Sequence, residues 1–299
     1  MGQEPDNARC LVIGANGLVG TCLTRILGEA GLTWKGTFRS RPKNGLIKLD
    51  ITDPRAANEL LLKVAPDVIF HCANLAGGVD YCESHPGIAA DFHLRAVQTL
   101  GSLCEKMGSE FVFVSSDYIF DGTKGPYKED DKPNPLNVYG KVKLAAEEWV
   151  TGNVKRRVII RTTNVFGWDP QSVTPNYMMG LYAALKAGKR FNAPSFLWGN
   201  PTYAGDLAKA MMELYLKDAS GCFHVVGPSI INRFEWAKRA CGIFGLDAGL
   251  LDDINAPSPN MVPRPLKSLL NTDKFTSSYK TVLHDVSKGL ALMKEEIDG

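Results

Sequence analysis

A tyrosine and a lysine stand four residues apart, at Tyr139 and Lys143, in a stretch whose pattern predicts a helix over residues 137–151. This spacing places both side chains on one face of the helix. A phenol with a pKa of about 10 is a poor acid–base group at neutral pH, but an ammonium about 4 Å away could supply the roughly 4 kcal/mol that brings the pKa to about 7. The pair therefore has the chemistry of a proton donor and the cation that tunes it.

Ser116 adds a third functional group. It follows an apolar run at residues 111–115 that predicts a buried strand. A hydroxyl at the carboxyl end of a strand can hydrogen-bond a substrate carbonyl and polarise it. With Tyr139 as proton donor, Lys143 as its tuner and ribose contact, and a cofactor as hydride source, these groups could add hydride to a ketone. Taken singly, the serine would be a backbone cap and the tyrosine–lysine pair two surface residues.

A turn with three glycines comes directly after the apolar run at residues 10–13. Glycine at this spacing allows a tight turn, close approach of the backbone to a pyrophosphate, and close packing of a helix on the strand. The helix that begins there would direct unpaired N–H groups at the phosphates. The turn therefore predicts a nucleotide-cofactor site, unless the glycines serve the turn alone. The expected contacts are Gly14, Asn16, Gly17, Leu18, Val19 and Gly20.

The elements that must position these residues alternate between strands and helices. Apolar runs predict buried parallel strands at residues 10–13, 32–38, 67–72, 111–115 and 157–161, and the pattern between them predicts helices near 18–30, 54–65, 86–107 and 137–151. Such repetition builds an α/β fold with a doubly wound, Rossmann-type parallel sheet. Ligands bind these sheets at the carboxyl ends of the strands, where the glycine turn, the segment 73–80 and Ser116 all fall.

The second half of the chain is less regular. Its pattern predicts helices at 175–188, 203–217 and 232–244 and a strand at 222–226. We expect an NAD(P)-binding domain over residues 1–165 and a smaller C-terminal substrate-binding lobe over 166–299, with the strand near 222–226 joining either one. Because no segment resembles a flexible linker, the two parts should be interleaved.

The composition excludes several classes of protein. The formal net charge is +2, and there is no basic tract that would favour nucleic acid. No run of about 18 apolar residues favours a membrane span. The seven cysteines form no CxxC pair, and the five histidines show no metal-ligand spacing. These features are typical of a reduced, cytoplasmic protein without a metal site.

The residues after the second predicted strand bear on the choice of cofactor. An acidic residue there would accept a hydrogen bond from the ribose 2′-hydroxyl of NAD, whereas arginine suits the 2′-phosphate of NADP. The chain has Arg39, Ser40 and Arg41 at this place and no carboxylate. The sequence therefore favours NADPH, with NADH as the alternative if the arginines are only solvated charges.

Motifs along most of the chain resemble those of the extended short-chain dehydrogenase/reductase superfamily and, within it, the dTDP-4-dehydrorhamnose reductase family. They are GANGLVG at 14–20, VDYCES at 79–84, SSDYIFDG at 115–122, PLNVYGKVKLAAE at 135–147, RTTNVFG at 161–167, NPTYAGDLA at 200–208 and RPLKSLLNTDKF at 264–275. The resemblance implies NAD(P)H-dependent reduction of a 4-keto group on a nucleotide-activated deoxysugar. A homodimer is the common assembly of this superfamily.

The resemblance also implies roles for single residues. Catalysis is expected from Ser116, Tyr139 and Lys143. Asp50 and Ile51 match a pair that contacts adenine, although Asp50 could equally cap the helix near Pro54. Further cofactor contacts are expected at Ala73, Asn74, Leu75, Thr162 and Thr163, and substrate contacts at Ser116, Asp117, Tyr118, Asn164 and Arg264, with Ser268 in the same segment. The Arg264 guanidinium is suited to a diphosphate, and an ordinary surface charge is the alternative.

Three departures from the family pattern concern the substrate. Asn164 stands where rhamnose enzymes typically have Trp, LWGNPTY at 197–203 replaces a DQxGSPTY stretch, and His93 stands where Asn is common. For His93 we expect a buried polar residue with a local partner. Together the changes favour a related enzyme with a different sugar.

Two alternative functions stay open. One is a nucleotide-sugar epimerase, which Asn164 favours. The other is a non-catalytic NADP-binding regulatory subunit like that of methionine adenosyltransferase, against which the intact Ser116, Tyr139 and Lys143 set counts. A dehydratase is disfavoured, because Tyr118 stands where that chemistry uses an acidic residue.

Overall fold

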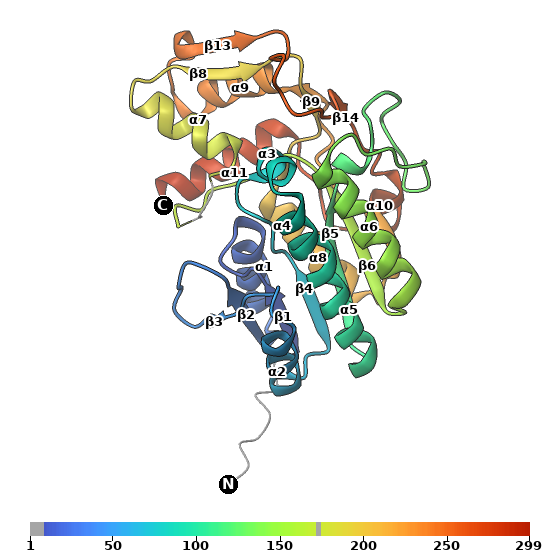
Figure 1. Ribbon diagram of the computed structural model, residues 1–299. Helices are drawn as coiled ribbons and strands as arrows, with labels where there is room; N and C mark the ends of the chain where they lie inside the picture. Colours follow the sequence, from blue (N-terminus) through green and yellow to red (C-terminus); the bar gives the residue numbers. More distant parts are fainter. Residues whose placement is uncertain (1–8, 172–174) are drawn as a thin grey trace.

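The computed structural model describes residues 9–171 and 175–299, and a seven-stranded parallel sheet lies at its centre (Figure 1). The strand order is β11-β6-β5-β4-β1-β2-β3, and every neighbouring pair is parallel. This arrangement confirms the predicted fold class. The strands are β1 (Cys10–Ile13), β2 (Trp34–Phe38), β3 (Ile47–Lys48), β4 (Val68–His71), β5 (Glu110–Ser116), β6 (Arg157–Thr162) and β11 (Gly221–His224).

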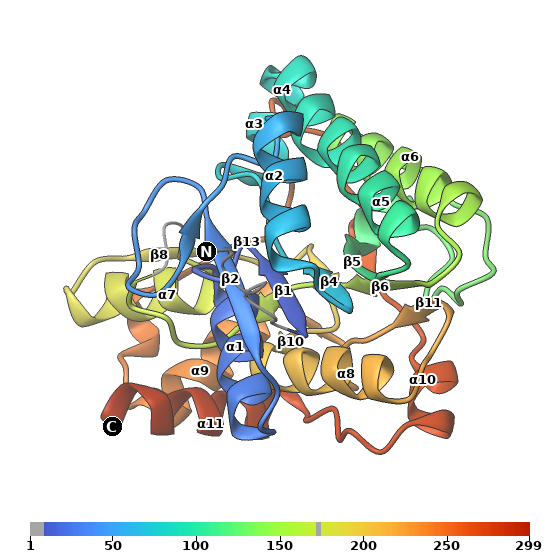
Figure 2. The same ribbon diagram turned by 90° about the horizontal axis from the view of Figure 1, so that it is seen from below.

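Helices cover both faces of the sheet because successive side chains of a strand point to opposite faces. In β1, Leu11 and Ile13 belong to one apolar core, whereas Cys10 and Val12 belong to the other. The first face is covered by α2 (Pro54–Val64), α5 (Ala96–Met107) and α6 (Val138–Asn153), and the second by α1 (Leu18–Glu29) and α8 (Ala204–Leu216) (Figure 2).

Two helix starts near the glycine loop and the Tyr139 segment are fixed by side-chain caps. Asp53 accepts hydrogen bonds from the backbone N–H groups of Arg55 and Ala56 at the start of α2. Asn137 accepts one from Gly140 N at 2.9 Å at the start of α6, as its position in the sequence predicts. Asp53, and not Asp50, therefore caps α2.

The helix expected over residues 86–107 is divided in the structure. It consists of α4 (Pro86–Ala90), a π-helical turn (Asp91–Arg95) and α5. A short helix, α3 (Gly78–Ser84), precedes it and was not predicted. The π-helical turn carries His93, whose ring lies against that of Tyr139 in the first turn of α6. Such turns occur often at functional sites.

The remaining elements form the second lobe. Its core joins α7 (Tyr177–Lys186), α9 (Arg233–Phe244) and α11 (Val286–Asp298). Three small sheets lie around this core: β7 (Val165–Phe166) with β10 (Thr202–Tyr203), β8 (Phe191–Pro194) with β13 (Leu251–Ile254), and β9 (Trp198–Gly199) between β12 (Ile231–Asn232) and β14 (Lys267–Ser268). A short helix at Ala248–Leu250 completes it, whereas α10 (Asp273–Ser278) packs against β11 and adds Phe275 to the second apolar core of the sheet.

The chain passes back from this lobe into the central sheet. β11 pairs with β6 at the sheet edge, and α8 shares the second apolar core with α1. The segment 204–224 therefore lies with the sheet in space. In the described ranges no helix is both long and apolar enough to cross a membrane.

Candidate active site

Four loops that were expected to hold functional residues lie at one edge of the sheet. β1, β4, β5 and β6 are parallel neighbours, so their carboxyl ends share this edge. The residues that follow these strands are Gly14, Cys72, Asp117 and Thr163. This edge is where ligands bind in sheets of this kind.

The glycine turn leaves no room for side chains. Gly14 has a φ of +80°, and a Cβ there would lie 2.8 Å from Ala73 Cα. A Cβ on Gly20 would lie 2.2 Å from the carbonyl oxygen of Gly14. Gly17 precedes α1 and has no side chain to cap it, so first-turn N–H groups stay available to an anion. The turn has the shape and polarity that a pyrophosphate requires.

The glycine turn is anchored to β2 and to the loop after it. Gly14 N donates to Thr37 Oγ1 at 3.2 Å, and Asn16 Nδ2 donates to the Arg41 carbonyl at 3.0 Å. Leu18 and Val19 are half-buried at the start of α1. Asn16 thus joins the loop expected to hold the pyrophosphate to the loop expected to hold the 2′-phosphate.

Arg39 and Asp50, both expected to contact the adenosine side of the cofactor, pair with each other. Arg39 Nε lies 3.1 Å from Asp50 Oδ2, and its guanidinium lies 5.5 Å from the Phe92 ring centroid. Asp50 also accepts from Thr52, which helps to lower its pKa. Ser40 and Arg41 are exposed, and Ile51 is buried below Asp50.

The expected contacts after β4 and β6 differ in exposure. Ala73 packs against Gly14, Asn74 is exposed and accepts from Leu75 N, and Leu75 is buried. Thr162 and Thr163 are buried; within the described residues the Thr162 hydroxyl has no hydrogen-bond partner. Any contact from Leu75 or Thr162 to a cofactor would therefore come from the backbone.

Tyr139 lies at the start of α6, between two aromatic rings. Its ring centroid is 5.3 Å from that of His93 and 5.8 Å from that of Tyr118, in edge-to-face geometry. α6 can come this close to Tyr118 because residue 140 is glycine: a Cβ there would lie 2.2 Å from the Tyr118 carbonyl oxygen. Tyr118 follows Ser116 by two residues at the end of β5, so this ring contact brings Tyr139 to the loop that carries Ser116.

Lys143 is also at this site, but its ammonium does not point to the phenol. The Nζ atom donates to the Val114 carbonyl at 2.7 Å and lies 4.1 Å from the Phe113 ring centroid. Burial lowers the pKa of Lys143 to about 7. Burial also raises the pKa of Tyr139, which Ser116 partly offsets. The expected tuning of the tyrosine by the lysine is therefore not present in this state.

Asp117 is placed differently from the direct substrate contact that was expected. It is 2% exposed, and its carboxylate accepts hydrogen bonds from Ser116, Thr163 and Ser268. These three hydroxyls belong to β5, the loop after β6 and β14, so the buried carboxylate links these three segments beneath the site. Tyr118, the next residue, is the one whose ring adjoins Tyr139.

Two arginines approach Tyr118, and the sequence indicated only one of them. Arg264 is 14% exposed and pairs with Asp80 of α3. Arg233, in the first turn of α9, donates to Asn164 Oδ1 at 3.3 Å and lies over the Tyr177 ring. Burial raises the pKa of Tyr118, and the charges of both arginines lower it. No sequence motif marks Arg233, because only the folded lobe brings the first turn of α9 to the loop after β6.

Asn164 is held in an unusual backbone conformation. Its φ is +46°, and its side-chain amide occupies the space above Gly199, where a Cβ would lie 2.2 Å from Asn164 Nδ2. The same side chain accepts from Arg233. Asparagine tolerates this left-handed region better than bulky residues do. Asn164 therefore links the loop after β6 to both β9 and α9.

His93 and His71 are buried beneath Tyr139 and Lys143. Within the described residues neither ring of the pair has a hydrogen-bond partner, so the local partner expected for His93 is not found. Burial and the nearby Lys143 charge lower the pKa of both, that of His71 to about 3. Both imidazoles are therefore neutral and place no second positive charge beside Lys143.

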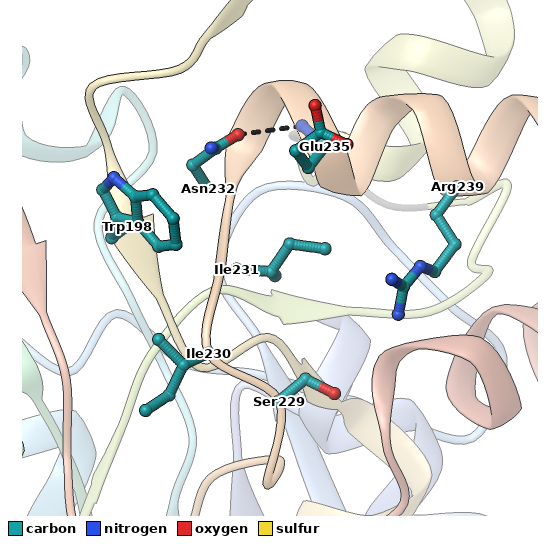
Figure 3. A pocket seen from close by; sticks show the side chains of 7 residues that line it. All are labelled: Trp198, Ser229, Ile230, Ile231, Asn232, Glu235 and Arg239. Atoms are coloured by element: carbon teal, nitrogen blue, oxygen red, sulfur yellow. Dashed lines mark hydrogen bonds between the residues drawn. The ribbon is translucent and has the colours of Figure 1, made fainter.

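A cavity of about 380 Å³ lies in the second lobe (Figure 3). The side chains of Trp198, Ile231 and Arg239 surround it, with Ser229, Ile230, Asn232 and Glu235 at its border. It shares no residue with the group around Tyr139. Across the described ranges no three His, Cys, Asp or Glu side chains are grouped to hold a metal ion.

Comparison with known proteins places this geometry in a family. The family model described as the RmlD substrate binding domain matches residues 8–298. The chain is 32% identical to a "probable low-salt glycan biosynthesis reductase" of Haloferax volcanii, over 87% of this chain and 88% of that protein. It is also 30% identical to methionine adenosyltransferase 2 subunit beta of Xenopus tropicalis, over 89% of this chain and 81% of that protein.

Solved structures resemble the fold over nearly its whole length. A hypothetical dTDP-4-dehydrorhamnose reductase from Sulfolobus tokodaii superposes with a TM-score of 0.83 at 32% identity, covering 94% of this chain and 98% of that one. The reductase from Bacillus anthracis, solved in complex with NADP, gives a TM-score of 0.86 at 22% identity over 97% and 99% of the two chains. The family expected from the motifs is thereby confirmed.

Proposed function

We propose, since the chain belongs to the RmlD substrate binding domain family, that it is an NAD(P)H-dependent reductase acting on a keto group of a nucleotide-activated sugar. The observation that carries the proposal is the contact of the Tyr139 ring with Tyr118, in the loop that follows Ser116, at the sheet edge that also holds the glycine turn. The reductase relatives agree with this chemistry.

In the proposed reaction, some residues bind the cofactor and another donates the proton. The glycine turn and the start of α1 hold the pyrophosphate, and Arg39 and Arg41 hold a 2′-phosphate. Bound NADPH supplies the hydride to the carbonyl carbon. Tyr139 donates its proton to the carbonyl oxygen, so that the ketone becomes an alcohol. Because burial raises the pKa of Tyr139, the phenol keeps this proton until negative charge develops on the substrate oxygen.

Two guanidinium groups support a nucleotide-linked substrate. Arg233 and Arg264 approach Tyr118 from different segments of the second lobe. Guanidinium groups bind phosphate oxygens in paired hydrogen bonds, so two of them suit a diphosphate. The diphosphate would lie beside Tyr118, with the attached sugar extending toward Tyr139. A deoxysugar carrying a 4-keto group is the substrate we propose.

A substrate panel tests the proposal. Purified protein is mixed with NADPH and a series of nucleotide-linked 4-keto sugars, and the loss of reduced nicotinamide is followed by its absorbance. We expect oxidation with at least one sugar. In Tyr139→Phe turnover should fall by about 10²-fold or more, as for loss of a general acid, with NADPH affinity unchanged. Tyr182→Phe, on α7, is the matched control. Loss of cofactor binding together with turnover would make Tyr139 structural.

A second function is favoured by one of the relatives. The similarity to a methionine adenosyltransferase subunit suggests a regulatory protein that binds NADP without turning it over. Co-purification with such a synthetase, together with no NADPH oxidation across the panel, would decide for this role.

An epimerase, by contrast, would retain tightly bound NAD through purification, which mass spectrometry of the native protein detects.

A further inference from the structure

We propose that Asn137 is a positioning residue that ties a strap, residues 261–266, to the start of α6. The strap runs from the exposed loop 255–260 into β14. It carries Arg264, and α6 carries Tyr139, so the tie sets the spacing between a diphosphate contact and the proton donor. The inference rests on the proposed function, because it takes Arg264 as a residue that binds the diphosphate of the substrate.

Both groups of the Asn137 amide are used, and they serve different segments. Oδ1 accepts from Gly140 N at 2.9 Å and caps α6, whereas Nδ2 donates to the Pro263 carbonyl at 2.8 Å. A backbone N–H can only donate and a carbonyl can only accept, so the two partners fix the orientation of the amide. Asn137 is 1% exposed, and a hydrogen bond is electrostatically stronger away from water. One buried side chain therefore holds the helix start and the strap together.

The tie lies next to both functional groups in the chain. Pro263 directly precedes Arg264, and Tyr139 lies two residues beyond the amide. On the other side of Arg264, the Leu266 carbonyl accepts from Trp198 N at 2.8 Å. Arg264 is thus held between two backbone contacts, one to α6 and one to β9. A substrate that is bound by its diphosphate presents its keto group to Tyr139 only if this spacing is kept, and a small displacement can cost much of the rate.

The short helix α3 makes a second connection between the strap and α6. Asp80 pairs with Arg264, and Glu83, one turn later in α3, accepts from Val138 N at 2.9 Å. Because this route remains when the Asn137 amide is lost, the strap should loosen without detaching. The expected effect is therefore that of a single hydrogen bond, about three- to tenfold in an equilibrium constant.

The test compares Asn137→Ser with Asn137→Ala. Serine can still cap α6 but is too short to reach Pro263, whereas alanine loses both contacts. For Asn137→Ser we expect the affinity for dTDP or UDP, measured by calorimetry, to fall by about three- to tenfold, with NADPH affinity unchanged. Hydrogen exchange should become faster in the strap of both variants, and in the first turn of α6 only for Asn137→Ala. The control is Asn134→Ser, which loses an amide hydrogen bond to Asp121 in the same loop and should change neither.

A double-mutant cycle separates positioning from a merely structural role. Because Asn137 acts through Arg264, Asn137→Ser should change dTDP or UDP affinity by less than about twofold once Arg264→Ala is present. An equal loss in both backgrounds overturns the proposal, as does unchanged exchange in the strap of Asn137→Ser. With a sugar that is reduced, KM should rise by the same factor as the loss of affinity and kcat should stay within about a factor of two.

Failure of the proposed function is recognised separately, in the unmodified protein. If that protein binds neither dTDP nor UDP, the proposed class of substrate is wrong. Exchange in the strap then tests the tie by itself: faster exchange in Asn137→Ser than in Asn134→Ser supports it, and equal exchange overturns it.

Discussion

Glu147 and Arg161 form a buried ion pair between α6 and β6. Arg161 Nη2 lies 2.8 Å from Glu147 Oε2, Nε lies 3.0 Å from the same oxygen, and the two side chains are 5% and 9% exposed, glutamate first. Glu147 stands one turn after Lys143, which stands one turn after Tyr139, on the same face of α6. The pair therefore holds α6, the helix that carries Tyr139 and Lys143, against the sheet.

Glu147→Ala should lower the free energy of unfolding by about 3–5 kcal/mol, because it leaves the Arg161 charge buried without its partner. Chemical denaturation followed by circular dichroism measures this. Glu148→Ala, at the exposed neighbouring position, is the control and should cost less than about 0.5 kcal/mol. Equal effects of the two substitutions would contradict the role given to the pair.

Gly20→Ala should disrupt the cofactor turn. Its Cβ would lie 2.2 Å from the Gly14 carbonyl oxygen and 2.7 Å from Ala15 Cα, so the backbone of the turn must move. We expect NADPH affinity, measured by fluorescence titration, to fall at least about tenfold, which corresponds to about 1.4 kcal/mol.

Gly28→Ala is the matched control in the same helix. The nearest atom to its Cβ is Trp34 Nε1 at 3.5 Å, an ordinary contact. Alanine favours helix over glycine by about 1 kcal/mol, so this variant should bind NADPH normally and unfold no more easily. If both variants bind NADPH like the unmodified protein, the glycine turn does not hold the cofactor.

The central sheet could be predicted because parallel strands leave a strong local signal. Each buried strand is an apolar run, and the loops that carry Gly14 and Ser116 follow such runs directly. Tyr139 and Lys143 lie in one helix, so their four-residue spacing in the sequence was enough to predict that they share a face. The types and spacing of residues were therefore enough to predict the glycine turn, the strand ends at the site and the face of α6 that carries Tyr139 and Lys143.

Other parts of the site depend on contacts between distant segments. The direction of Lys143 toward Val114 follows from the packing of α6 on β5 and has no sequence signature. The same holds for Arg233, which reaches Asn164 only because the fold brings the first turn of α9 to the loop after β6. Asp117 could be picked out by motif, but its enclosure by Ser268 required the fold of the second lobe. Long-range geometry, more than residue type, decided these roles.

Arg39→Ala should reduce the preference for NADPH. Arg39 follows β2, pairs with Asp50 and lies over the Phe92 ring, and we expect it to contact a 2′-phosphate. A hydrogen bond to a charged group contributes about 1.5–3 kcal/mol, so NADPH affinity should fall by roughly tenfold or more while NADH affinity stays the same. Titration with both cofactors measures this. Arg25→Ala on α1 is the control, and equal loss for both cofactors would argue against a 2′-phosphate contact.

Glu110→Gln should stabilise the protein above neutral pH. Glu110 is 1% exposed, and burial raises its pKa from 4.5 to about 7, although Arg156 lies 3.5 Å away. A carboxyl with a raised pKa binds protons more tightly in the folded state, so folding loses stability as the pH rises from about 4.5 to about 7, and the full cost applies above that range.

Removing this charge should therefore raise the free energy of unfolding at pH 8 by about 1–2 kcal/mol, since a shift of one unit corresponds to about 1.4 kcal/mol and Arg156 offsets part of it. At pH 4 glutamate is already protonated in both states, and the two proteins should unfold alike. Thermal unfolding of Glu110→Gln and of the exposed-site control Glu59→Gln, measured from pH 4 to pH 8, tests this. A gain that is the same at every pH would mean that packing, and not the carboxylate charge, is responsible.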